Sequence, residues 1–161
     1  MFKASVKIPQ REQLMRKLPN FHNWVGEKFM YACGFFVQER AKKKVPVDTS
    51  RLKTSIKLTV DNEGIKSTAL ITAGNETELN YAPHVEYGTK PHKVSGKHLL
   101  NWVHRHGMPS SAAFAIANTI AKKGVKARPF MRPAKEALRE EQEKLLQKVY
   151  LQAKKQFPEV S

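Results

Sequence analysis

The sequence has one cysteine, no long apolar run and fewer than half as many acidic as basic residues. Because Cys33 is the only cysteine in the sequence, an internal disulfide is excluded, and this suits a reducing compartment. The longest apolar run, residues 29–37, is far shorter than a membrane span, and the N-terminus has no apolar stretch of signal-peptide length. We therefore expect a soluble protein made in the cytoplasm, with no membrane partner. Its 161 residues suffice for a single domain over residues 1–161.

Sequence signatures of catalysis are also missing. The chain has no G-x-S-x-G, no phosphate-binding Walker loop, no G-x-G-x-x-G and no H-E-x-x-H. His98, His104 and His106 are close in sequence, but their segment has no cysteine or acid to complete a metal site. We expect no catalytic residue, no metal, no cofactor and no small-molecule substrate.

Basic residues dominate the charge, and their distribution is uneven. The formal net charge is +15, from 29 Lys and Arg against 14 Asp and Glu. Residues 61–90 hold two cations and five acids, whereas residues 91–130 hold seven cations and no acid. This contrast predicts a negative and a positive patch, which suits head-to-tail self-association as well as contact with DNA. Trp102, within the basic stretch 93–105, fits either a nucleic-acid contact or a core anchor surrounded by solvated lysines.

Hydrophobic periodicity predicts helices around one hairpin. We expect helices over residues 10–18, 21–44, 97–106, 112–123 and from 133 to near 158, and strands over residues 56–61 and 65–73. Asn20 is the expected cap of the second helix, and Ser110 or Ser111 that of the fourth, which Gly124 ends. The expected fold is α+β, a small antiparallel β-sheet flanked by a long N-terminal helix, short central helices and a long C-terminal helix.

Residues 80–90 combine features that core segments rarely share. Gly88 suits a left-handed step that ends one element and turns the chain. Glu86 lies between apolar neighbours, where an unpaired carboxylate would be costly, so we predict that it pairs with Arg51 or Arg128. Phe130 is expected to return the chain to the core.

Three motifs together resemble one protein family. They are VPVDTSRLKTSI at 45–56, YAPHVEYGT at 81–89 and ARPFMRPA at 127–134. In order and spacing they are similar to the head–tail joining, or tail-completion, family of long-tailed bacteriophages and prophages, over about residues 8–155. One departure is Ser50, where the family usually has glycine, which argues against a left-handed turn there. In the first motif, Asp48 or Thr49 can accept backbone hydrogen bonds as a helix cap would.

The resemblance implies a small α+β subunit, without catalysis, that forms a ring at the neck or tail end of the virion. It would be synthesised in the bacterial host cytoplasm, and its partners would be copies of itself and neighbouring neck or tail proteins. The motifs supply the structural and interface candidates: Asp48, Thr49, Arg51, Tyr81, Val85, Glu86, Tyr87, Gly88, Thr89, Arg128, Pro129, Phe130 and Pro133.

The alternative function is a basic DNA-binding protein that uses residues 91–130, for which the sequence offers charge but no helix-turn-helix or zinc signature. We expect such DNA contact to be weak and independent of sequence. A small nuclease is a third candidate, without a supporting motif.

Overall fold

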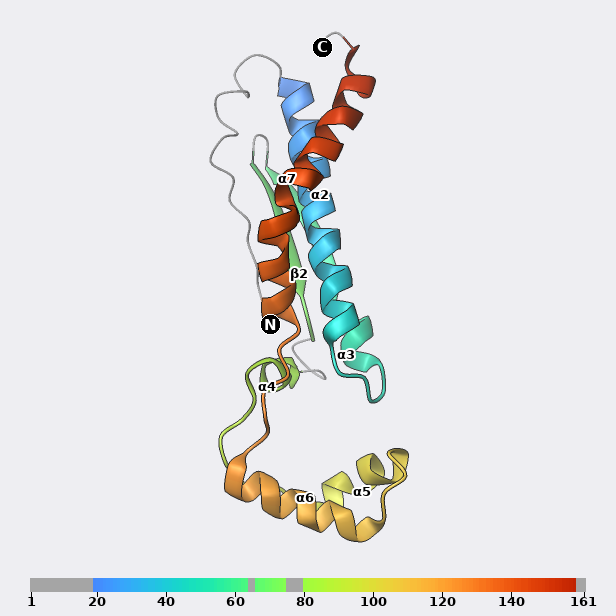
Figure 1. Ribbon diagram of the computed structural model, residues 1–161, viewed down its shortest axis with the longest axis vertical. Helices are drawn as coiled ribbons and strands as arrows, with labels where there is room; N and C mark the ends of the chain where they lie inside the picture. The colour runs from blue at the N-terminus through green and yellow to red at the C-terminus, as the bar shows by residue number, and fades with distance from the viewer. Residues whose placement is uncertain (1–18, 64–65, 75–79, 159–161) are drawn as a thin grey trace. The chain divides into compact units, whose positions relative to one another are not determined.

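The computed structural model describes residues 19–63, 66–74 and 80–158, which form helices and one β-hairpin (Figure 1). The elements are α2 (Pro19–Lys44), α3 (Arg51–Thr54), β1 (Lys57–Glu63), β2 (Lys66–Thr72), α4 (Ala82–Tyr87), α5 (Gly96–Arg105), α6 (Ser110–Lys123) and α7 (Met131–Gln156). The predicted α+β class is confirmed. The helix expected at 10–18 lies outside the described residues.

The chain divides into two compact units. Unit 1 consists of Met1–Ala82 and Pro129–Ser161, and unit 2 of Pro83–Arg128. The expectation of a single domain over residues 1–161 remains a prediction.

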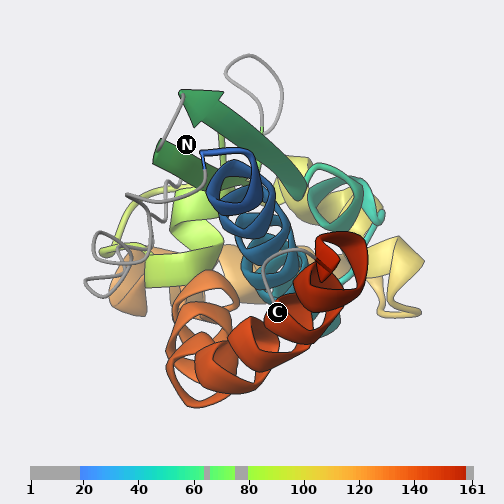
Figure 2. The ribbon, with the colours of Figure 1, turned by 90° about the horizontal axis from the view of Figure 1, so that it is seen from above.

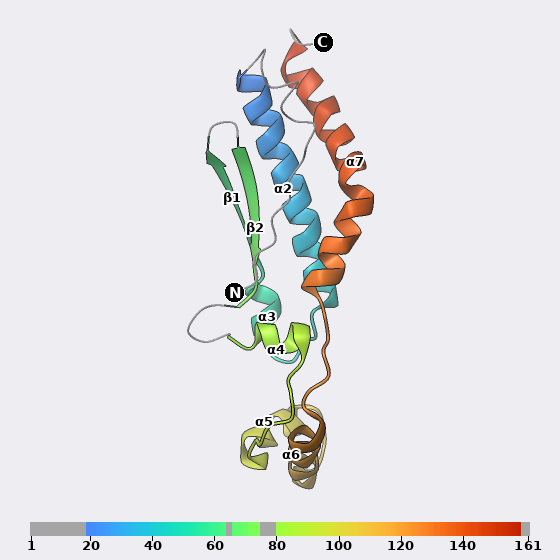
Figure 3. The same ribbon diagram turned by 90° about the vertical axis from the view of Figure 1, so that its left-hand side faces the viewer.

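Unit 1 is built in layers around α2. Figures 2 and 3 show α2 between the hairpin on one side and α7 on the other. Helix α2 is therefore covered on two sides, by the hairpin and by α7, instead of along a single apolar stripe. The buried apolar side chains come from all three layers: Phe29, Met30, Cys33, Val37 and Ala41 from α2, Ala69 and Ile71 from β2, and Leu138, Val149 and Ala153 from α7.

Gly34 allows the hairpin to approach α2 closely. A Cβ atom at this position would collide with a methyl group of Leu58 and lie 3.3 Å from the Cβ of Ala69. The side-chain amide of Gln38 donates a 2.9 Å hydrogen bond to the carbonyl of Ile56, just before β1. Packing against the hairpin thus offsets the poor helix propensity of the glycine.

The hairpin is an antiparallel pair in which one face is buried. Leu58 lies opposite Ile71, and Val60 opposite Ala69. Along β2, buried residues alternate with half-buried ones, as expected for a strand with one face on a helix.

Two of the predicted helix starts are wrong. α2 already includes Pro19, so Asn20 lies inside the helix instead of capping it. α6 begins at Ser110, and the residue at its N-cap is Pro109. Pro109 has an extended backbone conformation, with φ −69° and ψ 153°, at the start of the helix. The hydroxyl of Ser110 does not cap the helix and instead forms a 2.9 Å hydrogen bond with Nε2 of His104. The N-cap of α6 is therefore a proline with extended backbone and no side-chain cap hydrogen bond.

α7 opens at Met131, two residues before the proline that was expected to start it. Pro133 still falls in the first turn, where a backbone N–H has no helical acceptor, so the proline costs the helix no hydrogen bond.

Unit 2 contains α5 and α6, which are joined by residues 106–109 and pack against each other. The fully buried side chains of Val103 and Ala113 lie on these two helices. Gly96 receives the ring of Phe114, whose Cδ1 is 2.7 Å from where a Cβ would be. The predicted end of α6 is confirmed, because Gly124 adopts φ 72°.

Candidate functional site

The first motif forms a turn and the short helix α3 in unit 1. Ser50, at the N-cap, has φ 61° and ψ −7°, the only positive φ outside glycine among the described residues. The argument against a left-handed turn at this position is therefore wrong. The turn aims the carbonyl of Ser50 at the amide of Thr54, which donates to it at 2.9 Å.

Helix α3 was missed by periodicity because it is only four residues long. Its position is set by tertiary contacts instead. Leu52 is buried, and the hydroxyl of Ser55 donates to the Leu52 carbonyl at 2.8 Å. The hydroxyl oxygen of Ser55 also accepts a 2.9 Å hydrogen bond from the amide of Gly74. This bond ties the end of α3 to the residues that follow β2.

Tyr81 brings the start of the second motif beside the first. Burial raises the pKa of the Tyr81 phenol, while the nearby charge of Arg51 lowers this pKa and that of Asp48 raises it. Asp48, Thr49 and Arg51 are themselves exposed. The charges of Asp48 and Arg51 thus act on a partly covered tyrosine within unit 1.

The rest of the second motif is α4 and the turn that ends it. Gly88 has φ 74°, which confirms the predicted left-handed step. Glu86 is completely buried, whereas Tyr87 is 57% exposed and Val85 is half-buried. Burial of this acid agrees with the expectation that it has a partner, but its pairing with Arg51 or Arg128 remains a prediction.

The second and third motifs are joined by backbone contacts within unit 2. The amide of Thr89 donates to the carbonyl of Val125 at 2.9 Å, and the amide of Val125 donates to the Thr89 hydroxyl at 3.0 Å. The amide of Arg128 donates to the carbonyl of Val85 at 2.8 Å. Gly88 is required here, since a Cβ would lie 2.5 Å from the Val125 carbonyl oxygen. Sequence reasoning missed this pairing, although glycines at 88 and 124 were a usable signal.

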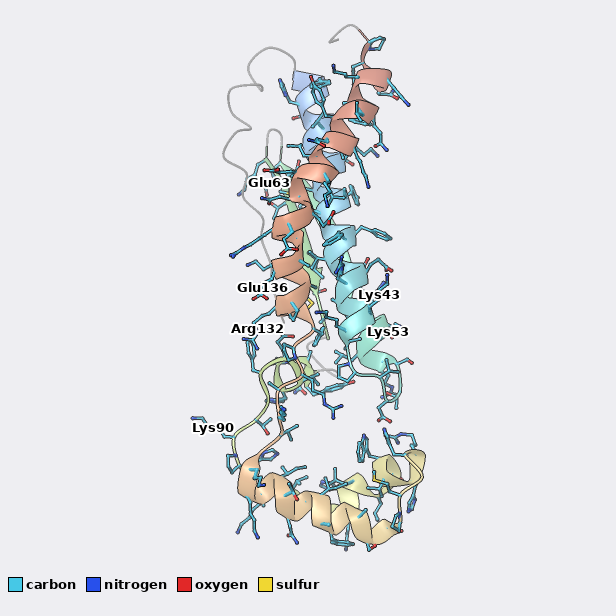
Figure 4. The ribbon with its side chains drawn as sticks, in the orientation of Figure 1. Lys43, Lys53, Glu63, Lys90, Arg132 and Glu136 are labelled. Atoms are coloured by element: carbon cyan, nitrogen blue, oxygen red, sulfur yellow. The ribbon has the colours of Figure 1, made fainter. Side chains whose placement is uncertain are left out.

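The third motif starts α7. Phe130 is fully buried, as predicted, while Pro129 is exposed and Pro133 half-buried. Arg132 and Glu136 lie one turn apart on the same side of α7 (Figure 4). The motif therefore combines a core anchor with a charged first turn.

The predicted acidic patch is smaller on the surface than the sequence suggested. Glu86 is buried, and Glu76 and Glu78 lie outside the described residues. Asp61 and Glu63 are exposed on β1, where Glu63 pairs in register with Lys66.

The basic residues of unit 2, by contrast, are all exposed. They are Lys90, Lys93, Lys97, Arg105, Lys122, Lys123, Lys126 and Arg128. Figure 4 shows Lys90 extending away from the ribbon.

No group of three metal-ligating side chains gathers within the described part of the chain. Two of the three neighbouring histidines have other contacts: His104 bonds Ser110, and the ring of His106 stacks on Trp102 with centroids 4.1 Å apart. Trp102 is half-buried, so it is neither a fully buried core anchor nor a freely presented ring.

Cys33 has no means of acting as a nucleophile. Its side chain is fully buried, and burial raises the pKa of the thiol to about 12. A thiol with such a pKa is protonated at neutral pH, and only the thiolate is reactive.

Over the described residues, none of the helices is both long and apolar enough to cross a lipid bilayer.

Comparison with known proteins finds a match to one protein family. Residues 11–88 match the family described as "Bacteriophage HK97-gp10, putative tail-component". This range covers the first motif and nearly all of the second. No curated protein and no solved structure matches the chain. The resemblance to a tailed-phage family is thus confirmed, because residues 11–88 are similar to the HK97-gp10-like family of phage tail components.

Proposed function

We propose that the chain is a non-catalytic subunit of the phage head–tail junction, which forms a ring with copies of itself and docks on neighbouring neck or tail proteins. It would accordingly reside in the virion. The observation that carries the proposal is the match of residues 11–88 to a phage tail-component family. The three motifs fit a structural role, because they form a turn, backbone hydrogen bonds between distant segments and the start of a helix.

Exposed apolar side chains on unit 1 support self-association. Tyr31 and Phe35, one turn apart on α2, are 45% and 59% exposed. On α7, Tyr150 and Leu151 are 41% and 62% exposed. A ring needs two different surfaces on each subunit, so that one copy can contact the next head-to-tail. Apolar patches on two separate helices fit this requirement.

Size-exclusion chromatography with light scattering tests the proposal. We expect the full chain, alone or mixed with the adjoining neck or tail protein, to form a species of fixed copy number. The double substitution Tyr31→Ser and Phe35→Ser should abolish that species. Val47→Ser, which removes a side chain 54% exposed in the loop after α2, is the matched control and should leave it unchanged. Circular dichroism verifies the fold of each variant.

A chain that stays monomeric both alone and with that partner, and whose Tyr31/Phe35 variant still supports particle assembly, would contradict the ring.

The charge contrast between residues 61–90 and 91–130 adds a second contact between copies to the proposal. Because Glu86 is buried, this contact depends mainly on Glu76 and Glu78, which lie outside the described residues. Reversing both to lysine should weaken the ring at low salt and leave the fold intact. If the variant assembled as well as the wild type at both low and physiological salt, the charge contact would be contradicted.

DNA binding is the second candidate function. The eight exposed cations of unit 2 favour it.

A further inference from the structure

Unit 2 presents positive charge without exposed negative charge. Eight Lys and Arg side chains are exposed over Pro83–Arg128, and the only acid in this range, Glu86, is fully buried. A surface of this kind attracts polyanions over a distance set by salt.

Helix α5 arranges part of this charge on one face. Val103 is fully buried, so the opposite side of the helix faces outward. Lys97, Asn101 and Arg105 follow one another at four-residue steps on that side, and all three are exposed. The two cations are therefore about 12 Å apart along the helix axis, which corresponds to the rise of about three to four phosphates on one DNA strand.

The hairpin of a second copy is a poor match for this face. Its described exposed charges are Lys57, Asp61, Glu63 and Lys66, which cancel. Copies of a chain with net charge +15 also repel one another, and a polyanion would relieve this repulsion.

Single-stranded nucleic acid is also less well matched to this α5 face than duplex. Proteins that bind single strands present aromatic rings to stack on bases. The aromatic residue of α5, Trp102, is half-buried and already stacked on His106, with the two rings inclined by 26°. The outward face of α5 offers hydrogen-bond donors, which suit phosphates.

We propose that the α5 face formed by Lys97, Asn101 and Arg105 binds the phosphate backbone of duplex DNA without reading its sequence. This inference deepens the proposed function, on which it rests, by naming the surface that meets a nucleic acid in the assembled particle. The remaining cations of unit 2 add long-range attraction.

Fluorescence anisotropy with a labelled 30-base-pair duplex of mixed sequence and the full chain, between 50 and 200 mM NaCl, tests the proposal. Lys97→Gln with Arg105→Gln should weaken binding at 100 mM salt roughly tenfold and reduce the slope of log K against log salt by about 1.8. Lys135→Gln with Arg139→Gln is the matched control, because it removes the same charges from exposed positions on α7. The control should change binding less than twofold.

Four results would overturn the proposal: equal loss in both double variants, tenfold preference for one duplex sequence, tighter binding of the single strand, or displacement by polyglutamate as effective as by unlabelled duplex. Circular dichroism confirms that both variants are folded.

Light scattering on the same samples, with and without the adjoining neck or tail protein, separates this inference from the proposed function. Ring formation without DNA binding refutes the inference alone. DNA binding by a chain that never assembles refutes the proposed function alone.

Discussion

Thr89 and Val125, 36 positions apart, are joined by two hydrogen bonds, one from each backbone amide. The amide of Thr89 donates to the Val125 carbonyl, and the amide of Val125 donates to the Thr89 hydroxyl. Both the backbone and the side chain of Thr89 therefore take part. Together with the bond from Arg128 to Val85, they close the chain around α5 and α6. The second and third motifs thus meet in a clasp that holds unit 2.

Glycine is required in this clasp, and Gly88→Ala should destabilise it strongly. The substitution combines positive φ with a Cβ 2.5 Å from the Val125 carbonyl oxygen and 2.8 Å from the Ala127 amide nitrogen. We expect a loss of more than about 2 kcal/mol in the free energy of unfolding, measured by urea denaturation. Gly107→Ala is the control, since Gly107 has φ 67° with no atom within 4 Å of its Cβ position, and should lose only about 1 kcal/mol. Equal losses would mean that backbone strain alone matters.

Ser50→Gly should stabilise the protein. A left-handed conformation costs a residue with a Cβ about 1–2 kcal/mol, which glycine avoids. Glycine has more conformational freedom to lose on folding, and this entropy cost offsets part of the gain. We therefore expect a gain of about 0.5–1 kcal/mol in urea denaturation. The same substitution at Ser111, exposed in the first turn of α6, should instead lose about 0.5 kcal/mol. A loss at position 50 would show that the serine side chain stabilises the turn.

Glu86→Gln should lower the free energy of unfolding by about 1–3 kcal/mol, because the residue is fully buried and the substitution weakens its polar contacts. Glu136→Gln, at an exposed position on α7, serves as the control and should change stability by less than about 0.5 kcal/mol.

A double-mutant cycle identifies the partner of Glu86. Combination with Arg51→Gln or Arg128→Gln should give a coupling energy above about 1 kcal/mol for one of the two arginines. Additive losses for both would contradict the predicted pairing.

The buried thiol of Cys33 should make stability fall at alkaline pH. Its folded pKa is about 12, above the ordinary value of 9.0, so between these values the unfolded chain loses a proton that the folded chain keeps. The stabilisation is complete below about pH 9 and is lost as pH rises toward 12, with a slope of up to about 1.4 kcal/mol per pH unit.

Denaturation of wild type and Cys33→Ala from pH 8 to 10.5 isolates this effect from the other groups that titrate there. The difference between the two proteins should shrink as pH rises. A constant difference would show that the thiol does not titrate between the folded and unfolded states.

The sequence determined the parts of this protein that depend on local pattern. Periodicity predicted α2, the hairpin, α5, α6 and α7, because a helix or strand with one buried face repeats its apolar residues at a fixed spacing. The left-handed glycines at 88 and 124 and the burial of Glu86 and Phe130 were also predictable from their immediate neighbours. The family resemblance came from the same local motifs.

The tertiary structure alone decided which distant segments meet. A four-residue helix such as α3 is unstable by itself, so its existence depends on Leu52 being buried and on the bonds of Ser55. Ser50 keeps a left-handed turn that its residue type disfavours, because the surrounding contacts outweigh a local cost of about 1–2 kcal/mol. The clasp between Thr89 and Val125 likewise needs chain closure over 36 positions, which leaves no periodic trace in the sequence.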